Sequence, residues 1–457
     1  MNRILLMGCS ILFGLSGFSQ QEDSLLIRKI ADDILVNGKA YENLRVLTKT
    51  VGGRLSGSPQ MVKAELWGLA AMKSAGADKA YLQECQVPHW IRGGKDEARF
   101  SVGAGGLQKS LDVLALGNSV GTGPKGISAQ VLLIGSFEEL ERRKLEVKGK
   151  IIFYNYKFNP KFIETFRSYG DAVRYRAIGP SLAAKYGAVA VLVRTMSHSV
   201  DNNPHTGALD YIDTLPKIPA AAVGLWDADK LASSIQQNKV VRVFLRTNAQ
   251  MLPDTTGHNV IGELTGSTYP DQFITIGGHL DSWDPAEGAH DDGTGCAHTI
   301  EVLRVLRAIG YQPKHSIRFV LFANEENGTR GGLKYAEQAK SNNEKHIFAL
   351  ESDAGGFTPR GFRLSLSSAQ LEKIQPWIKL LKEYGVYEFN AGGGGTDIEP
   401  LNEQLGIPLG ELEPDSQRYF DYHHARTDVF ENVNKRELEL GAINIAALIY
   451  LIDKYGL

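Results

Sequence analysis

From Asn259 onward the sequence alternates apolar strand patterns with helical patterns, and this alternation restricts the fold more than any other feature. The strand patterns lie at 272–281, 315–326 and 345–356, and the clearest helical patterns lie at 293–310, 331–340 and 436–457. Strands that alternate with helices predict the α/β class, with a mixed, mostly parallel sheet flanked by helices. Ligands bind such sheets at the carboxyl ends of the strands. The sequence therefore predicts a functional site at that edge.

Each of the three strand patterns ends in side chains that commonly bind metals. These side chains are His279 and Asp281, then Glu325 and Glu326, then Asp353. Two loops add further candidates, which are Asp291, Asp292, His423, His424 and Asp428. So many carboxylates in one place would repel one another and raise one another's pKa. A divalent cation removes that penalty, and a donor set of imidazole with carboxylate suits zinc.

The number of candidates favours two metal ions rather than one. Each ion takes about three protein ligands plus water, and two ions about 3.5–4 Å apart share a bridging carboxylate and a bridging water. Asp291 is the candidate bridge, and the predicted ligands are His279, Asp291, Glu326, Asp353 and His424. Glu325 stands beside a ligand, where a general base belongs. Asp281 is placed to accept the second imidazole N–H of His279 and to fix its tautomer.

Each motif has an ordinary structural explanation when it is taken alone. A His-x-Asp is usually part of a loop, Glu-Glu is common at a solvated helix start, and His-His in a loop is more often a surface pair. Independent surface features would not all fall at one edge of a predicted sheet. Their joint placement therefore favours the metal site.

Five short segments carry a resemblance to a known family: "GHLDSWD", "HDDGTG", "ANEENG", "ESDAGG" and "YHHARTD". They resemble the motifs of the co-catalytic zinc exopeptidases, which include aminopeptidases and glutamate carboxypeptidases. The resemblance is strongest to the plasma glutamate carboxypeptidase branch, where "VPHWIRG", "PHTGALDYIDTLPKIPA" and "GGGGTDI" also match. It covers nearly the whole mature chain.

The resemblance implies two zinc ions per chain. One ion is held by His279, Asp291 and Asp353, and the other by Asp291, Glu326 and His424. The general base is Glu325, with Asp281 as the partner behind the first histidine. The resemblance also implies a cis peptide bond between Asp291 and Asp292. It favours His424 over His423, because the family's ligand histidine precedes an acid by four residues and Asp428 supplies that acid.

The expected reaction is hydrolysis of dipeptides or short peptides. Glu325 takes a proton from the zinc-activated water and later hands it to the leaving amine. The zinc ions together with Tyr422 stabilise the oxyanion. The loop "AGGGGTDIEP", with Thr396 and Asp397, is expected to shape the substrate pocket, since glycines let backbone approach a ligand; a plain flexible loop is the alternative. Two departures from the family pattern, Asn324 and the loose "HHARTDV", bear on substrate preference rather than metal binding.

The expected domain organisation has four parts. Residues 1–19 are a signal peptide, 20–95 the N-terminal part of the peptidase domain, and 251–457 the zinc peptidase catalytic domain. The resemblance implies that residues 96–250 are an inserted protease-associated domain. It also leans toward a homodimer.

The N-terminal sequence and the net charge indicate where the protein is located and which partners are excluded. One early cation, an apolar stretch and then small residues predict a secretory signal peptide, with a membrane anchor as the alternative. The product would be secreted or periplasmic, with no membrane partner. A net charge of -2 and a pI of about 6.6 give no electrostatic footprint for nucleic acid. Whether Cys85 and Cys296 pair is open at this point.

Several other functions compete with the dipeptidase or carboxypeptidase prediction. An aminopeptidase of the same family fits the same ligands. A non-catalytic binding protein on a peptidase fold would be expected to lose ligands or the base, yet all six positions are present. The serine-hydrolase pattern "GNSVG" around Ser119 is followed by "TGPKG", which forbids the required helix. A single-zinc glutaminyl cyclase shares the expected fold but lacks the inserted domain.

Overall fold

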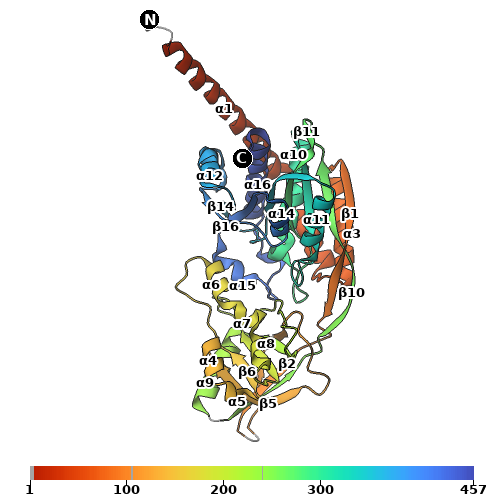
Figure 1. The fold of residues 1–457 in the computed structure, drawn as a ribbon, viewed down its shortest axis with the longest axis vertical. Coiled ribbons are helices and arrows are strands. Elements are labelled where there is room, and N and C mark those ends of the chain that lie inside the picture. The colour runs from red at the N-terminus through yellow and green to blue at the C-terminus, as the bar shows by residue number, and fades with distance from the viewer. Residues whose placement is uncertain (1–4, 104–105, 239) are drawn as a thin grey trace.

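The computed structural model contains two eight-stranded sheets, each covered by helices on both faces (Figure 1). The structure describes residues 5–103, 106–238 and 240–457, without the side chains of residues 5–20. Residues 1–4 of the predicted signal peptide, and the side chains of the rest of it, lie outside that description. Within the described helices, none is long and apolar enough to span a membrane.

The first sheet, here called the peptidase sheet, has the strand order β1-β10-β12-β11-β13-β16-β14-β15. Its central strands β12, β11, β13 and β16 run parallel, and β1 and β10 form a long antiparallel pair at one side. The strands are β1 (Lys79–Ile91), β10 (Gln250–Leu264), β11 (Tyr269–His279), β12 (His315–Phe322), β13 (Lys345–Glu351), β14 (Pro359–Leu364), β15 (Glu388–Ala391) and β16 (Leu409–Pro414).

Helices bury both faces of the peptidase sheet. One face packs on α1, α3, α10 and α16, and the other on α11 and α14. Successive residues of β12 alternate between the two cores, with Phe319 and Leu321 in one and Val320 and Phe322 in the other. The helices of this part are α1 (Leu5–Asn37), α2 (Ala40–Val46), α3 (Pro59–Ser74), α10 (Thr294–Ala308), α11 (Arg330–Ser341), α12 (Ser368–Ile374), α13 (Ile378–Leu381), α14 (Glu399–Leu405), α15 (Tyr419–Tyr422) and α16 (Lys435–Tyr455).

The second sheet lies between β1 and β10 in the sequence, so residues 97–246 are called the second-sheet region. Its order is β3-β2-β9-β5-β6-β7-β8-β4, with β5 to β8 parallel. The strands are β2 (Glu97–Val102), β3 (Lys109–Leu111), β4 (Val113–Ala115), β5 (Ile127–Ile134), β6 (Ile151–Tyr154), β7 (Ala190–Arg194), β8 (Ala220–Val223) and β9 (Val241–Arg246). The helices are α4 (Phe137–Arg142), α5 (Lys144–Val147), α6 (Thr165–Ala172), α7 (Arg174–Ala177), α8 (Gly179–Ala184) and α9 (Leu225–Gln237).

The mixed α/β class with flanking helices is confirmed. The strand patterns predicted at 272–281, 315–326 and 345–356 correspond to β11, β12 and β13. Strands β14 and β15, which extend the peptidase sheet at its far edge, were not predicted, because each is short and has no clear apolar alternation. Cys85 and Cys296 are both free and buried, so they do not pair.

Candidate metal centre

The carboxyl ends of three parallel strands bring the predicted ligands together. His279 is the last residue of β11, Glu325 and Glu326 follow β12, and Asp353 follows β13. The loop after β11 returns through a short segment, Ala289–Gly293, which carries Asp291 and is not helical at that residue. The parallel register therefore places at one edge the residues that the sequence separates.

His279, Asp291 and Asp353 form the first group of donors. The Nε2 atom of His279 lies 3.1 Å from Oδ1 of Asp291 and 3.4 Å from Oδ1 of Asp353. The other ring nitrogen, Nδ1, lies 2.9 Å from the backbone oxygen of Asp281, so the carbonyl takes the place predicted for the Asp281 carboxylate, which lies 3.8 Å away. This contact directs Nε2 toward the two carboxylates, and the three donor atoms are close enough together to hold one ion.

His424 and Glu326 form the second group around the same Asp291. The Nε2 atom of His424 lies 3.3 Å from Oδ2 of Asp291 and 3.1 Å from Oε2 of Glu326. The two oxygens of Asp291 thus face two different imidazoles. His423 stacks on His424 with ring centroids 3.5 Å apart, and its Nε2 lies 3.8 Å from the same Oδ2. The geometry therefore brings both histidines to Asp291, with His424 nearer.

The second-sheet region holds His424 from the opposite side. The backbone N–H of Thr206 donates to the carbonyl of His424 at 3.0 Å. The Thr206 carbonyl in turn lies 3.4 Å from Nδ1 of His424. His424 has a positive φ of 60°, a backbone conformation that residues other than glycine rarely adopt. The contacts with Thr206 stabilise His424 in this conformation.

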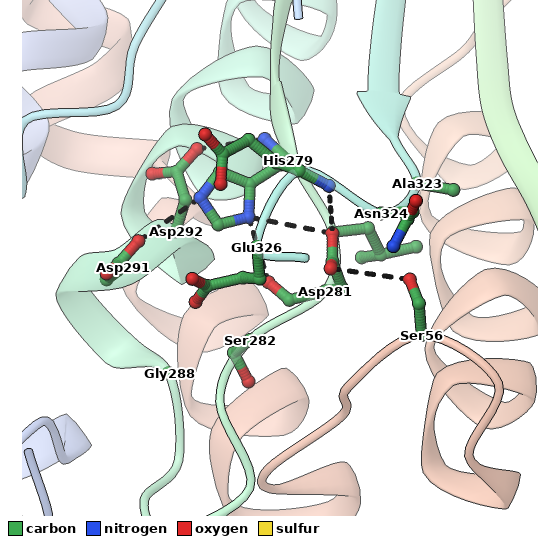
Figure 2. Close-up of polar contacts among 12 residues, drawn as sticks. Ser56, His279, Asp281, Ser282, Gly288, Asp291, Asp292, Ala323, Asn324 and Glu326 are labelled. Carbon is green, nitrogen blue, oxygen red and sulfur yellow. Dashed lines mark hydrogen bonds and ion pairs between the residues drawn. The ribbon is translucent and has the colours of Figure 1, made fainter. Parts of the chain in front are cut away.

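Buried polar contacts orient the loops that carry the donors (Figure 2). Asp281 accepts the hydroxyl of Ser56 at 3.3 Å, as Figure 2 shows. It also accepts the backbone N–H of Glu325 at 3.0 Å. Asp428 accepts the N–H groups of His290 and Asp291 at 2.7 Å and 3.2 Å. The Asp291–Asp292 peptide bond is cis, as the resemblance implies.

A second set of contacts braces the loop from 280 to 288. Arg54 is fully buried and donates to the carbonyls of Leu280, Glu287 and Gly288. Asp292 accepts the backbone N–H groups of His279 at 3.1 Å and Gly295 at 2.8 Å. Its role is therefore to support the loop.

The site concentrates buried negative charge. Burial raises the pKa of Glu325 to about 7, and burial also raises the pKa of Glu326 and of Asp353. Burial acts on Asp291 in the same sense, but His279 and His424 outweigh it and hold the pKa of Asp291 well below its usual range. Asp291 Oδ2 and Asp353 Oδ1 have no hydrogen bond within the described residues. A divalent cation would satisfy both oxygens.

A cavity of about 260 Å³ opens onto these donors. One wall consists of the metal-binding candidates, with Glu325, Thr396 and Tyr419. The opposite wall comes from the second-sheet region, as Phe166, Tyr169, Arg176 and Ala208. A site at the junction of two sheets is a common position for a ligand. Sequence reasoning missed this second wall because its residues lie far from every metal motif in the chain.

Two predicted substrate-binding residues are placed differently from expectation. Tyr422 stacks on His290 with centroids 5.2 Å apart, while Tyr419 lines the cavity in its place. Tyr419 contacts His423 with ring centroids 5.2 Å apart, whereas Tyr422, at the end of the same short helix, packs on His290 and Phe357. Asp397 is fully buried, where its backbone N–H donates to Glu351 at 3.1 Å. Thr396 lines the cavity, as expected for that loop.

Ser119 of the "GNSVG" pattern has a structural role. It is buried, and its hydroxyl oxygen accepts the backbone N–H of Ala220 at 2.9 Å. The residue precedes an irregular segment rather than a helix. The serine-hydrolase alternative therefore has no support in the geometry.

Comparison with known proteins identifies the family. The profile of peptidase family M28 matches residues 259–449. Carboxypeptidase Q from Homo sapiens is 34% identical over 433 residues, which cover 94% of this chain and 88% of that protein. The chain belongs to peptidase family M28. Carboxypeptidase Q from Xenopus laevis is 36% identical over 406 residues, covering 88% of this chain and 84% of that protein.

Two solved structures share this fold over most of their length. A peptidase M28 precursor from Shewanella amazonensis superposes with a TM-score of 0.89 at 31% identity, covering 95% of this chain and 97% of that chain. An aminopeptidase from Aneurinibacillus sp. strain AM-1 superposes with a TM-score of 0.63 at 21% identity, covering 93% and 95%. As an M28 peptidase, this chain is a metallopeptidase.

Proposed function

We propose that this M28 peptidase is a di-zinc exopeptidase that hydrolyses dipeptides or short peptides with free ends. One observation carries the proposal: the two oxygens of Asp291 face two imidazoles, His279 at 3.1 Å and His424 at 3.3 Å. A carboxylate that presents one oxygen to each of two donor groups is the geometry of a bridging ligand. The names of relatives, carboxypeptidase Q and zinc aminopeptidase, agree with it.

The donors fit two zinc ions. His279, Asp291 and Asp353 would hold one ion, and Asp291, Glu326 and His424 the other. Bound zinc would lower the pKa of a shared water and polarise the substrate carbonyl. Nitrogen and carboxylate oxygen donors are those that zinc takes in catalytic sites.

Glu325 is the proposed general base. Its carboxylate lines the cavity beside the donor groups, and its backbone N–H is fixed by Asp281 at 3.0 Å. It would take a proton from the attacking water and return it to the amine that leaves. Tyr419, on the cavity wall, replaces Tyr422 as the aromatic residue next to the reacting carbonyl.

We propose that residues 96–250, which contain the second-sheet region, form an inserted protease-associated domain. The peptidase domain would then comprise residues 20–95 and 251–457, joined through the β1–β10 pair.

Residues 1–19 are proposed to be a signal peptide removed on export, and the mature chain is proposed to form a homodimer. Mass spectrometry of the protein recovered from its native host tests the cleavage before Gln20.

The test of the function uses metal content and activity together. Wild type should carry about two zinc ions per chain and hydrolyse alanyl-alanine. Glu325→Gln should retain the zinc and lose hydrolysis, because the amide cannot take the proton. Glu337→Gln, on the exposed surface of α11, is the matched control and should behave as wild type. Zinc-free wild type, or a Glu325→Gln variant as active as wild type, would overturn the proposal.

A further inference from the structure

A second cavity adjoins the cavity at the proposed metal centre. It has a volume of about 470 Å³, and both cavities are lined by Phe166, Asp353 and Thr396. A third cavity of about 260 Å³ continues the second, with which it shares Phe166, Arg363 and Glu411. The second and third cavities, here called the side pocket, therefore lead from a proposed zinc ligand toward the outer strands of the peptidase sheet.

The floor of the side pocket is a row of polar side chains across four strands. Glu351 of β13 is in register with Glu411 of β16, which is in register with Arg363 of β14, and Asn390 of β15 completes the row. All four residues line the side pocket. The next residue of β16, Leu412, is buried in the core on the opposite face, as the alternation of side chains along a strand requires. The row thus replaces the apolar contacts by which α11 and α14 cover the rest of this face.

Both arginines of the side pocket already have carboxylate partners. Arg363 lies 2.6 Å from Glu413 and 3.6 Å from Glu164. Arg360 lies 3.1 Å from Asp415. The positive charges on the wall of the pocket are therefore matched by the protein itself.

Glu411 is the carboxylate for which no partner is left. Its side chain has no hydrogen bond or ion pair within the described part of the chain, although Arg363 stands beside it in the sheet. Burial raises the pKa of Glu411 to about 7. The neighbouring Glu351 is fully buried, and its Oε1 also lacks a hydrogen bond within the described residues. Two adjacent carboxylates without partners favour a positively charged ligand.

The shape of the side pocket favours an organic cation over a metal ion. The groups of donors close enough to hold an ion, among the residues that the structure describes, include neither Glu351 nor Glu411. Phe166 and Leu409 give the pocket apolar lining on the way to the carboxylates. A long side chain with a charged end, such as lysine or arginine, matches this combination, because its stem packs on apolar surface while its end stays paired.

The glycine loop closes on the floor of the pocket. Gly393, Gly394 and Gly395 all line it. A Cβ at Gly395 would come within 2.1 Å of Oε2 of Glu351, so only glycine allows this close approach. The loop that the sequence analysis expects to shape the substrate pocket therefore lies against the unpaired carboxylates.

We infer that Glu411 binds the charged end of a lysine or arginine side chain that belongs to a residue next to the scissile bond. This inference rests on the proposed function and adds the substrate class, short peptides with a basic residue. The residue lies next to the scissile bond because the side pocket begins at Asp353, a proposed zinc ligand. A charge-assisted hydrogen bond to Glu411 then supplies the partner that the protein does not.

Two pairs of dipeptides that differ in one charge test the assignment. Lysyl-alanine is compared with norleucyl-alanine, and alanyl-lysine with alanyl-norleucine, since norleucine has the stem of lysine without the ammonium group. In one of the two pairs, wild type should prefer lysine by about tenfold in kcat/KM, because hydrogen bonds to charged groups are among the strong ones. Glu411→Gln should lose that preference and keep its zinc. Glu411→Asp should retain part of it.

The control is Glu403→Gln, on the exposed surface of α14, which should keep the preference in full. A Glu411→Gln variant that retains the preference would overturn the inference. A variant that loses zinc, or that loses lysine and norleucine hydrolysis equally, would show that Glu411 supports the metal centre and would also overturn it.

The same peptides separate this inference from the proposed function. Both members of each pair have the same free termini, so equal cleavage within both pairs by wild type would overturn the inference and leave the proposed function intact. Wild type that carries zinc and cleaves none of the four peptides would instead count against the proposed function.

Binding tests the inference when turnover is absent. Calorimetry on zinc-loaded Glu325→Gln should show about tenfold tighter binding of the lysine peptide in one of the two pairs. Adding Glu411→Gln should abolish the difference. Equal binding within both pairs to Glu325→Gln would overturn the inference whatever the activity measurements show.

Discussion

The two walls of the cavity at the proposed metal centre are built in different ways. The peptidase wall carries carboxylates and imidazoles at the ends of buried parallel strands, and backbone contacts such as those of Asp428 and Asp281 hold them. The opposite wall carries two aromatic rings, Phe166 and Tyr169, and one arginine on the short helices α6 and α7. In this account the first wall performs the chemistry and the second recognises the substrate.

The peptidase wall depends on the second-sheet region for the position of one of its histidines. His424 belongs to the peptidase wall, yet Thr206 of the second-sheet region contacts both its backbone and its ring. His424 is therefore held by contacts from both regions of the molecule. Substitutions on the peptidase wall should change metal binding and the rate, and substitutions on the other wall should change substrate affinity.

The largest effect is expected from Asp291→Asn. This residue faces both histidines, so the variant should lose zinc from both positions and about 10³-fold or more of kcat. Asp353→Asn should affect mainly the position beside His279. Zinc per chain and dipeptide hydrolysis are measured in parallel, with the exposed Asp254→Asn as control. Full zinc content in Asp291→Asn would contradict the bridging role.

A smaller loss is expected from Asp428→Asn. Asp428 accepts the N–H groups of His290 and Asp291, and it is only 3% exposed. Removing one of its acceptor oxygens should loosen the segment that carries Asp291 and weaken zinc binding by about 10–100-fold. Competition with a chelator measures the affinity. Unchanged zinc affinity would show that the segment is held without this carboxylate.

On the opposite wall, which the second-sheet region forms, Phe166→Ala should raise KM by about threefold to tenfold and leave zinc bound. The ring lines the cavity and stacks on Tyr419 with centroids 5.2 Å apart. Steady-state kinetics on a dipeptide with a large apolar side chain measure the change. Phe162→Ala, in the same segment but outside the cavity lining, is the control and should leave KM unchanged. Loss of zinc in Phe166→Ala would contradict the expectation that substitutions on this wall change substrate affinity and not metal binding.

The smallest effect is expected from Arg426→Ala. Arg426 and Asp112 form an exposed ion pair at 2.9 Å between the peptidase part and the second-sheet region. Exposed pairs contribute about 0–1 kcal/mol to stability, so the melting temperature should change little. Thermal unfolding measures it. A large drop would show that this pair, rather than the contacts around His424, holds the two parts together.

The sequence predicted the peptidase wall and not the other. Strands β11, β12 and β13 are buried on both faces, so each one reads as a continuous apolar run in the sequence. Polar residues follow each run, and the parallel arrangement of the strands brings those residues together. Arg176 and Phe166 carry no such local signal, because only tertiary contacts between distant parts of the chain bring them to the cavity. Tyr422 was predicted beside the substrate, but it stacks on His290 and Phe357, and Tyr419 of the same short helix lines the cavity.

We propose that two zinc ions would share Asp291 as a ligand. Anomalous scattering at the zinc edge, from crystals of the zinc-loaded protein, tests it most directly. The account predicts two peaks on either side of Asp291, one beside His279 and Asp353 and the other beside Glu326 and His424. A single peak, or a second peak bound by His423 with His424 turned away, would contradict it.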